Sequence, residues 1–341
     1  MFLAAKDGFL ILNFPEMVSF ERFMEICLYD PVEGYYHRDR GEIFGKKGDY
    51  YTSSHTHECF AHCLAEELLH WFYVLGKPAR FHVCEMGAGD GNLADQIREY
   101  VAENYQDLER SLDYIEVDID RGALPEEITG VVFSNEFFDA LPVRRVLYKD
   151  QAYWEIFVHS SEGEIREVLQ PLENPFIESY LEDGFDLLRS GWIYEVNIRA
   201  LEVLKDLNER LLRGCIVTID YGYMSSEYED MATDQGTLAC YQRHQITGNP
   251  YQNPGTQDIT CHINFEMLMK WGEELGWSNQ KLISQREFLC ERGLPEILKV
   301  EEEEGLFRSD RLGDRLKLKE LLLPGGISDR MRVLVQQVRL D

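Results

Sequence analysis

Residues 81–101 of the chain read FHVCEMGAGDGNLADQIREYV. An apolar run at 81–84 is followed by glycines at alternate positions, Gly87, Gly89 and Gly91. Apolar side chains then recur every four residues, at Leu93, Ile97 and Val101. This pattern predicts a strand, a sharp turn and a helix. Because glycine has no Cβ, main-chain N–H groups and the positive end of the helix can approach a small ligand closely at the turn.

The glycine spacing separates two kinds of nucleotide ligand. A dinucleotide-binding turn follows G-x-G-x-x-G, but Asn92 occupies the position of its third glycine. The spacing is instead E-x-G-x-G-x-G, begins with Glu85, and resembles the S-adenosylmethionine loop of class I methyltransferases. In that class the acid lies near the amino-acid part of the cofactor, and the glycines admit its methionine and ribose. The resemblance implies cofactor binding by Glu85, Gly87, Gly89 and Gly91; a purely structural turn is the alternative.

The chain has a strongly acidic composition. Its 341 residues include 34 lysines and arginines against 62 aspartates and glutamates, a formal net charge of −28. Such a field repels phosphate backbones and attracts basic partners, so we expect no nucleic-acid partner. The length suits one large α/β domain with insertions or two domains, and the 44% hydrophobic content can supply a substantial core.

Cysteine usage and hydropathy bear on the compartment. The eight cysteines, at positions 27, 59, 63, 84, 215, 240, 261 and 290, form no C-x-x-C pair. They predict reduced, mostly buried thiols in a cytoplasmic protein. The apolar run at 9–14 contains Asn13 and is too short for a signal peptide. No run approaches the roughly 20 apolar residues of a membrane span, so we expect no membrane partner.

The region before the glycine turn is expected to form a helix and a loop that covers the site. Residues 15–29 place apolar side chains on one helical face. The stretch 33–54 is rich in glycine and tyrosine and has neither helical nor strand periodicity. Long loops inside compact domains are often functional, so this one is a candidate wall of the site. The candidates are Gly48, Asp49, Tyr50, Tyr51 and Thr52, of which Gly48, Asp49 and Thr52 are assigned to the cofactor.

A cluster of histidines and cysteines suggests a metal site at first. Its members are His55, His57, Cys59, His62 and Cys63. Zinc needs four ligands that converge on one point. A helical face shared by Cys59, His62 and Cys63 would continue toward the apolar run at 68–72, which is typical of a helix that packs small thiols into the core. We therefore expect no metal.

The strands after the glycine turn raise a question about the cofactor pocket. Residues 114–118 predict a second strand, and methyltransferases of this class place an acid at its end to bind the ribose hydroxyls. Glu116 and Asp118 both qualify, because alternation points them to the same side. The next strand is predicted at 131–134, so only about ten residues separate the two strands. A parallel crossover that contains a helix needs a dozen or more residues. A strand and its helices are therefore missing from the usual order, or the segment is shortened.

The remaining elements are predicted from periodicity. Residues 145–170 suggest an antiparallel insertion, and 197–212 a helix that Gly214 stops. Strands are expected at 215–219 and 332–338, and helices at 265–275 and near 301–304. Just before the helix predicted at 265–275, polar residues alternate with apolar ones, as on one face of a strand. The polar residues are Asp258, Thr260, His262 and Asn264.

Polar residues follow the carboxyl ends of the predicted strands. They are Glu85, Glu116 or Asp118, Asn135 with Glu136, and Asp220 with Tyr221. In open parallel sheets ligands bind at that edge. Acidic residues at several strand ends are stronger evidence for a ligand than one glycine turn alone. Together with the turn they predict a cofactor site.

Nine motifs occur in the order found in the MidA-like proteins, also called the DUF185 or mitochondrial complex I assembly factor 7 family. They are EGYY, GDYYTS, EMGAGDGNL, NEFFDALPVRR, IDYGY, GTLACYQRH, QDITCHINF, SQREFLCERG and RMRVLVQQ. The resemblance spans nearly the whole chain, and the segment 119–130 departs from it. It implies a class I methyltransferase fold, S-adenosyl-L-methionine as cofactor and, for the mitochondrial members, symmetric dimethylation of a protein arginine.

An arginine acceptor needs carboxylates to hold its guanidinium and to offset repulsion from the sulfonium. Glu136 is the first candidate, with a helix N-terminal acid as the alternative, and Asp139 is the second, with a brace of the turn as the alternative. Asn135 is assigned to cofactor binding and catalysis. His262 is a candidate proton acceptor or a hydrogen-bonded brace. Tyr221 and Asp258 are assigned to the substrate, and Tyr221 could equally be a half-buried aromatic.

The predicted fold is an α/β, Rossmann-like class I methyltransferase sheet with helices on both faces, an antiparallel insertion and an N-terminal helical and loop extension. The expected domains are 1–80 and 81–341, with a substrate-side subdomain at about 143–190 and 223–262. The predicted function is transfer of a methyl group from S-adenosyl-L-methionine to a protein arginine. Transfer to a small molecule, or a non-catalytic assembly protein that keeps the fold, are the alternatives.

Overall fold

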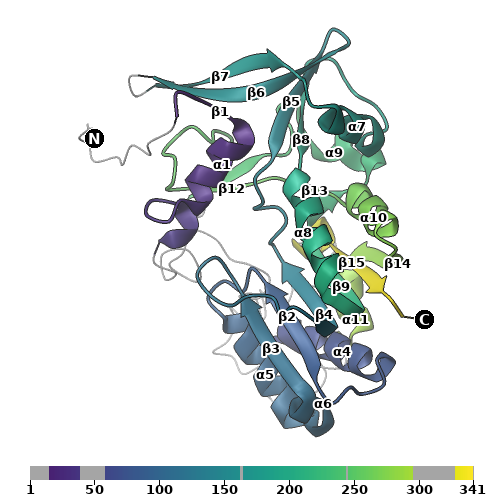
Figure 1. Ribbon diagram of the computed structural model, residues 1–341. Helices are drawn as coiled ribbons and strands as arrows, with labels where there is room; N and C mark the ends of the chain where they lie inside the picture. Colours follow the sequence, from purple (N-terminus) through teal and green to yellow (C-terminus); the bar gives the residue numbers. More distant parts are fainter. Residues whose placement is uncertain (1–14, 39–57, 162–163, 243–244, 295–326, 341) are drawn as a thin grey trace, which may run out of the picture.

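The computed structural model describes residues 15–38, 58–161, 164–242, 245–294 and 327–340 (Figure 1). Several predicted features lie outside the described residues. They are Gly48, Asp49, Tyr50, Tyr51, Thr52, His55, His57 and the helix near 301–304.

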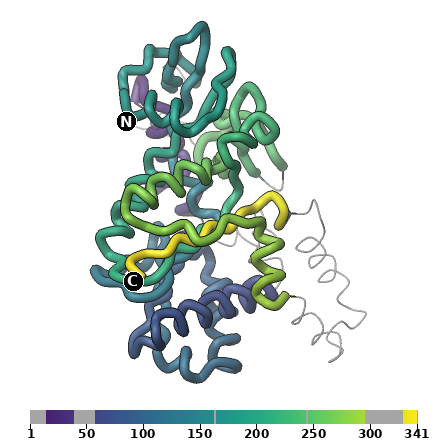
Figure 2. The backbone as a smooth tube through the Cα atoms, turned by 90° about the vertical axis from the view of Figure 1, so that its right-hand side faces the viewer, coloured from purple at the N-terminus to yellow at the C-terminus, as the bar shows by residue number. Residues whose placement is uncertain are grey.

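The main sheet follows the order β14-β15-β9-β4-β2-β3. Its strands are β2 (Phe81–Met86), β3 (Leu112–Val117), β4 (Ile128–Asn135), β9 (Leu211–Tyr223), β14 (Ser278–Ser284) and β15 (Met331–Val338). Strands β3, β2, β4 and β9 run parallel, and the short β13 (Ile263–Asn264) pairs with the end of β9. The C-terminal strand β15 lies antiparallel between β9 and β14, as the yellow segment in Figure 2 shows.

Helices cover both faces of this sheet, which confirms the predicted α/β class. One face packs α4 (Cys59–Val74), α5 (Asn92–Asn104), α6 (Gln106–Ser111) and α11 (Gln285–Glu291). The other packs α8 (Ile198–Arg210) and α10 (Phe265–Glu274). Strand residues alternate between the two cores, so Val131 faces α4 whereas Val132 faces α8.

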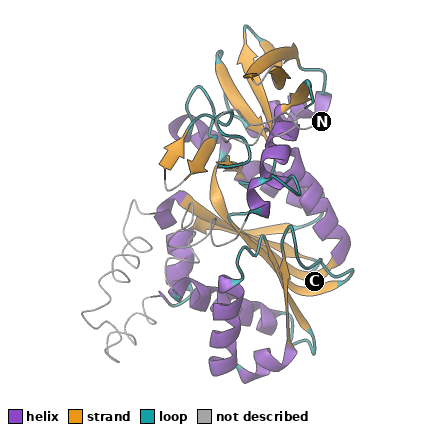
Figure 3. Cartoon of the chain, turned by 90° about the vertical axis from the view of Figure 1, so that its left-hand side faces the viewer, coloured by secondary structure: helices purple, strands orange, loops and turns teal. Residues whose placement is uncertain are grey.

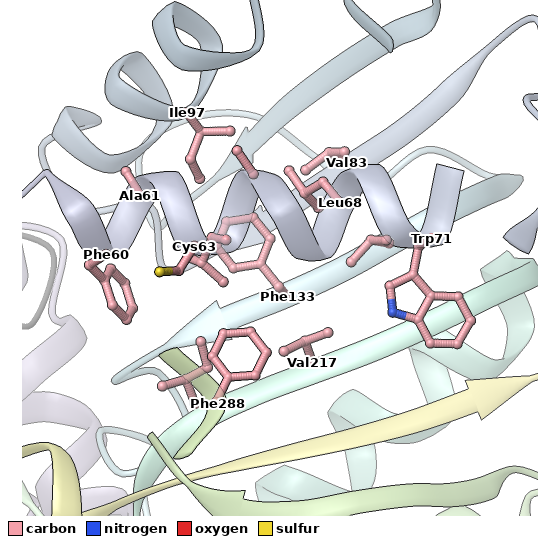
Figure 4. Close-up of a cluster of buried hydrophobic side chains, with 14 of the residues drawn as sticks. Phe60, Ala61, Cys63, Leu68, Trp71, Val83, Ile97, Phe133, Val217 and Phe288 are labelled. Atoms are coloured by element: carbon pink, nitrogen blue, oxygen red, sulfur yellow. The ribbon is translucent and has the colours of Figure 1, made fainter. Parts of the chain in front are cut away.

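Helix α4 shows where the cysteine-rich segment lies. Figure 4 shows it across the sheet, with Cys63 among Phe60, Phe133 and Phe288. Cys59 and Cys63 are both fully buried, which confirms the packing interpretation of these thiols. Within the described ranges no group of three or more His, Cys, Asp or Glu side chains could hold a metal ion, and no described helix is long and apolar enough to cross a membrane.

The connection from β3 to β4 positions the site. Strand β2 lies between β3 and β4, and the ten residues 118–127 join them without a helix. In the described part of the chain no strand lies beyond β3, so a strand is missing there, as the short spacing predicted. From β2 the chain runs to β3 on one edge of β2 and then crosses to β4 on the other edge. The boundary between β2 and β4 is therefore the topological switch point of the sheet.

A second, antiparallel sheet forms the predicted insertion and lies at one end of the molecule (Figure 3). Its strands are β1 (Met17–Ser19), β5 (Arg144–Lys149), β6 (Ala152–Ser161), β7 (Glu164–Pro171) and β8 (Trp192–Val196). The helix predicted at 15–29 is therefore partly wrong. Residues 17–19 pair with β6, and the helix α1 (Phe20–Tyr29) starts only after its N-cap, Ser19.

Shorter elements complete the fold. They are η1 (Tyr35–His37), α7 (Pro175–Gly184), η2 (Ser225–Glu227), α9 (Tyr228–Met231), β10 (Ala239–Gln242), β11 (Gln245–Thr247), β12 (Asp258–Thr260) and α14 (Ile327–Arg330). Where the domain boundaries lie stays a prediction.

Two further predictions about these elements are wrong. Residues 258–264 do not form one strand face, because β12 pairs with β10 whereas β13 pairs with β9 in the main sheet. Gly214 does not stop a helix, since α8 ends at Arg210 and Gly214 lies inside β9. A Cβ at Gly214 would lie 1.8 Å from the Gly130 carbonyl oxygen, so the glycine permits close approach of β4.

Candidate functional site

A cavity of about 560 Å³ opens at the carboxyl ends of β2, β3 and β4, at the switch point of the sheet. Its first wall is the glycine turn and the end of β3, represented by Glu85, Met86, Gly87, Ala88, Gly89, Asp90, Leu93, Val117, Asp118 and Ile119. The second follows β4 and consists of Asn135, Glu136, Phe137, Ala140, Leu141 and Pro142. The third comes from α1, η1 and α8 and consists of Glu25, Tyr29, Tyr36, Arg199, Glu202, Val203 and Asp206.

The glycine turn requires glycine for two reasons. Gly87, Gly89 and Gly91 have φ values of +70°, +56° and +85°, which side-chain-bearing residues rarely adopt. Space is also limited, because a Cβ at Gly87 would lie 3.1 Å from the Phe137 ring. The N–H groups of Gly87 and Ala88 both donate to the Val117 carbonyl oxygen. The turn is therefore anchored to the end of β3 while Gly87 and Gly89 line the cavity. Gly91 does not line it, and a Cβ there would lie 3.0 Å from Glu116 Oε2.

Glu85 ends β2 and lies at the cavity wall. Only 4% of it is exposed, and its Oε2 accepts a hydrogen bond from the Tyr114 hydroxyl at 2.7 Å. Burial raises the pKa of Glu85 to about 8, against a smaller lowering by the Tyr114 hydrogen bond. A cation in the cavity would favour its charged form.

The structure separates Glu116 from Asp118. Asp118 lines the cavity, and its Oδ2 accepts from the Gly89 N–H at 2.6 Å. Glu116 does not line the cavity and instead pairs with Arg98 and Arg121, at 2.8 and 3.0 Å. Of the two acids, Asp118 is therefore the one placed to meet a ligand, and its contact with a ribose stays a prediction.

The turn after β4 has no glycine. Asn135 and Glu136 both line the cavity, and the Glu136 backbone has a φ of +54°. The Glu136 N–H donates to the Ile219 carbonyl oxygen at 3.0 Å, and the Asn135 side-chain amide lies 3.4 Å from the Glu136 carboxylate. A strained non-glycine backbone at a cavity wall costs on the order of 1–3 kcal/mol and is typical of functional sites.

The side chain of Asp220 holds the turn after β4 through hydrogen bonds to its backbone. Its Oδ2 accepts from three successive backbone N–H groups, those of Phe137 at 3.2 Å, Phe138 at 2.9 Å and Asp139 at 3.3 Å. Asp220 is fully buried, and burial raises its pKa. In the sequence Asp220 was one of several acidic residues that follow a predicted strand. No local pattern indicated that its carboxylate would accept hydrogen bonds from Phe137 and Asp139, which lie 83 and 81 positions earlier in the chain.

Five of the predicted site residues that the structure describes do not line the cavity, namely Gly91, Asp139, Tyr221, Asp258 and His262. Asp139 is buried, and burial together with neighbouring Asp220 raises its pKa well above its usual range. Asp258 is buried and accepts from the hydroxyl of Tyr36, a wall residue, at 2.8 Å. Tyr221 stacks on His262 with ring centroids 6.1 Å apart. Neither of these two rings lines the cavity, and burial lowers the pKa of His262 to about 4.

Sequence analysis missed the wall formed by α1, η1 and α8. The rings of Tyr29 and Tyr36 lie 5.4 Å apart, and the Tyr29 hydroxyl donates to the Ala140 carbonyl oxygen at 2.9 Å. Arg199 on α8 pairs with Glu25 and Glu202, at 3.6 and 3.1 Å. Tyr36 does belong to the tyrosine-rich stretch that we expected to border the site, but helical periodicity gives no sign that α1 and α8 meet there.

The walls fit a cationic nucleotide cofactor. The volume is within the range of about 300–1,000 Å³ that small-molecule sites occupy. Bare glycine backbone on one side permits close approach, and three carboxylates from different strand ends, Glu85, Asp118 and Glu136, offset a positive charge. A sulfonium compound has this combination of needs.

A family model described as "Putative S-adenosyl-L-methionine-dependent methyltransferase" matches residues 63–124 and 120–283 of the chain. The two matched segments meet at the short connection after β3. Together they include the glycine turn, the turn after β4 and Asp220.

Curated relatives carry a more specific name. "Protein arginine methyltransferase NDUFAF7 homolog, mitochondrial" from Drosophila melanogaster is 24% identical over 311 residues, which cover 74% of this chain and 66% of the relative. "Protein arginine methyltransferase NDUFAF7, mitochondrial" from Homo sapiens is 25% identical over 333 residues, which cover 83% of this chain and 71% of the relative. The chain thus spans about two thirds of the length of the first relative.

Two solved structures from Burkholderia thailandensis share the fold. A COG1565 superfamily member bound to S-adenosyl-homocysteine superposes with a TM-score of 0.80 and 26% identity, over 96% of this chain and 89% of that one. The native crystal structure of a protein of this superfamily gives a TM-score of 0.77 at the same identity.

Proposed function

Because the family model matches more than half of the chain, the chain belongs to this family of S-adenosyl-L-methionine-dependent methyltransferases, and we propose that its acceptor is an arginine side chain of a protein. The observation that carries the proposal is the Glu136 carboxylate, which lines the same cavity as the bare glycine turn. The names of the curated relatives support a protein arginine as acceptor.

The first two walls of the cavity have separate tasks in this proposal. Glu85, the backbone at 87–89 and Asp118 hold the cofactor, which when bound supplies a methyl group on a sulfonium. Asn135 and Glu136 border the space for the acceptor. These assignments follow from which strand end each residue occupies at the switch point.

Methyl transfer is an in-line displacement, so the protein mainly aligns the acceptor nitrogen and excludes water. The N–C bond would form as the C–S bond breaks, S-adenosylhomocysteine would leave with the electron pair of that bond, and the proton of the guanidinium nitrogen would pass to solvent. A carboxylate can accept two parallel N–H bonds from a guanidinium, which fixes its plane and concentrates lone-pair density on the remaining nitrogen. The proposal gives this role to Glu136. It is supported by the contacts that fix the turn: the Glu136 N–H donates to the Ile219 carbonyl oxygen, and Asp220 accepts from the N–H groups that follow.

The electrostatics of the cavity favour a basic acceptor. Its described lining carries the acids Glu25, Glu85, Asp90, Asp118, Glu136, Glu202 and Asp206, and one basic side chain, that of Arg199. Arg199 is already paired with Glu25 and Glu202. The net charge of −28 extends the attraction to the surface as a whole, because opposite charges speed encounter.

The names of the relatives also bear on the cellular compartment of the protein. The relatives carry the word mitochondrial in their names, so the cytoplasmic location expected from cysteine usage has no support from them. All eight cysteines are free thiols, seven of them buried, which suits any reducing compartment.

The test is transfer of labelled methyl groups to arginine-containing peptides and to a lysine-containing control. Glu136→Gln should reduce transfer by at least about a hundredfold while S-adenosylhomocysteine affinity stays within about twofold, because a transition-state contact is lost and cofactor contacts are kept. Glu202→Gln is the matched control, since it removes one charge from the opposite wall.

Unchanged turnover of Glu136→Gln would refute the role of Glu136. Label that accumulates in metabolites of a lysate, and in no protein band, would favour a small-molecule acceptor. Failure of the wild-type protein to bind S-adenosylhomocysteine in calorimetry would favour a non-catalytic assembly protein.

A further inference from the structure

We propose that Arg121, in the short connection between β3 and β4, is a positioning residue that sets cofactor affinity by holding the glycine turn. The proposal rests on the cofactor assignment above and adds a residue outside the cavity wall. It also gives a function to the segment that departs most from the family pattern.

Arg121 contacts the glycine turn directly. Its Nη2 donates to the carbonyl oxygens of Gly89 at 2.9 Å and Ala88 at 3.4 Å. The same nitrogen lies 3.0 Å from Glu116 Oε2, so the carboxylate orients the guanidinium toward the turn. A charged donor to a backbone carbonyl is stronger than a neutral one, and this contact is only partly exposed.

The backbone after β3 presents Arg121 in this position. Asp118 and Arg121 form an isolated two-residue bridge, with N–H to O distances of 2.9 and 3.3 Å. Gly122 follows with a φ of +67°, and a Cβ there would lie 1.9 Å from the Glu116 carbonyl oxygen. The connection must therefore fold back sharply on β3, which directs Arg121 toward residues 88 and 89.

Arg121 and Asp118 act on Gly89 as a pair. Asp118 Oδ2 accepts from the Gly89 N–H at 2.6 Å, while Arg121 donates to the Gly89 carbonyl oxygen. Both backbone groups of the central glycine are thus held by one five-residue segment, 117–121. A turn with three glycines loses much conformational freedom on ordering, so contacts that order it before binding raise ligand affinity.

The topology explains why such a brace falls to this segment. In the described part of the chain the sheet ends at β3, and the connection to β4 contains no helix. A longer crossover would place a packed element beside the turn. Here a charged side chain on a tight turn fills that place.

Arg98 provides a matched control. It pairs with the other oxygen of the same carboxylate, Glu116 Oε1, at 2.8 Å, and its guanidinium lies over the Tyr114 ring. The two arginine side chains are similarly exposed, at 38% for Arg98 and 35% for Arg121. Arg98 also lies 3.5 Å from Asp95, but its described contacts do not include the glycine turn. Its removal therefore takes away an ion pair with Glu116 and leaves the contact of Arg121 with the turn in place.

The experiment is calorimetry of S-adenosylhomocysteine binding to the full chain. Arg121→Ala should weaken binding about tenfold, the loss of one charge-assisted hydrogen bond, whereas Arg98→Ala should stay within about twofold. Arg121→Lys should recover part of the loss, because an ammonium can still reach a carbonyl oxygen. With a methyl acceptor present, Arg121→Ala should raise the cofactor KM and leave kcat at saturating cofactor within about twofold.

Equal losses in Arg121→Ala and Arg98→Ala would overturn the proposal, because the ion pair and not the turn contact would then be responsible. Wild-type affinity in Arg121→Ala would overturn it as well. If Arg121→Ala does not fold, Arg121→Lys and Arg121→Gln carry the same comparison against Arg98→Ala. Absence of binding to the wild-type protein would count against the cofactor assignment itself and is thus distinct from these outcomes.

Discussion

Two turns at one edge of the sheet border the cavity, and they reach left-handed backbone conformations by different means. The turn after β2 uses Gly87, Gly89 and Gly91, which adopt positive φ without steric cost. The turn after β4 places Glu136 at a φ of +54°, where a side chain is strained. In the proposed function the first turn presents bare backbone to the cofactor, whereas the second presents a carboxylate, which glycine cannot supply.

The two turns also differ in what holds them. The glycine turn is braced by partly exposed groups after β3, Asp118 and Arg121. The Glu136 turn is fixed by Asp220, a fully buried carboxylate with three backbone donors on one oxygen. The difference teaches that strain at Glu136 needs a buried network to offset it, whereas flexibility at the glycines needs only local contacts.

Removal of the Asp220 carboxylate should break the second turn most severely. Asp220→Ala leaves three N–H groups, two buried and one partly buried, without their acceptor, so the free energy of unfolding should fall by about 3 kcal/mol or more, measured by urea denaturation. Asp220→Asn keeps one acceptor oxygen and should lose less. Equal stability of Asp220→Ala and the wild type would show that the network does not hold the turn.

A Cβ added at Gly87 should disturb the contact between the glycine turn and the turn after β4. Gly87→Ala places a Cβ at φ +70° and 3.1 Å from the Phe137 ring, so it should cost about 2 kcal/mol and weaken S-adenosylhomocysteine binding. Gly76→Ala is the matched control, because Gly76 has a φ of +78° and nothing within 4 Å. If both variants lose the same stability, backbone strain alone is responsible and the contact with Phe137 is unimportant.

The buried acid at the first turn should make stability depend on pH. Burial raises the pKa of Glu85 from 4.5 to about 8, so in this window the folded state keeps a proton that the unfolded state has lost. The contribution of Glu85 is therefore present below about pH 4.5 and falls as pH rises toward 8, by up to about 1.4 kcal/mol per pH unit. Urea denaturation at several pH values should show a flatter profile for Glu85→Gln. An unchanged profile in that variant would contradict the raised pKa.

Replacement of the strained residue should separate stability from activity. Glu136→Gly relieves strain of about 1 kcal/mol but adds glycine's chain entropy of similar size, so the free energy of unfolding should stay within about 1 kcal/mol of the wild type. Methyl transfer should fall by at least about a hundredfold, because the guanidinium contact is lost. A loss of more than about 2 kcal/mol would show that the side chain, and not function, retains Glu136 at this position.

The parts of the site that sequence analysis identified share a local cause. The glycine turn follows from residue chemistry within 81–101, and Asn135 and Glu136 follow from the end of an apolar run. Each of these features needs only its own neighbours in the chain. The choice between Glu116 and Asp118 depended on Arg98 and Arg121, and it therefore required the structure.

Tertiary pairing decided the features that sequence analysis missed. Residues 17–19 form a strand because β6 offers them an edge about 140 positions away. Asp258 and Asn264 separate into two sheets because β10 and β9 each pair with half of that stretch. Tyr29, Tyr36 and Arg199 reach the cavity only because α1 packs near α8.

The amino-acid sequence by itself determined that a strand, a glycine turn and a helix form at 81–101 and that acids leave several strands at one edge, because periodicity and glycine conformation act over a few residues. Only the tertiary structure decided which acids face the cavity, which ones brace the turns, and that Asp220 holds the three residues that follow the strained Glu136. Those outcomes depend on long-range pairing and burial, which no short stretch of sequence contains.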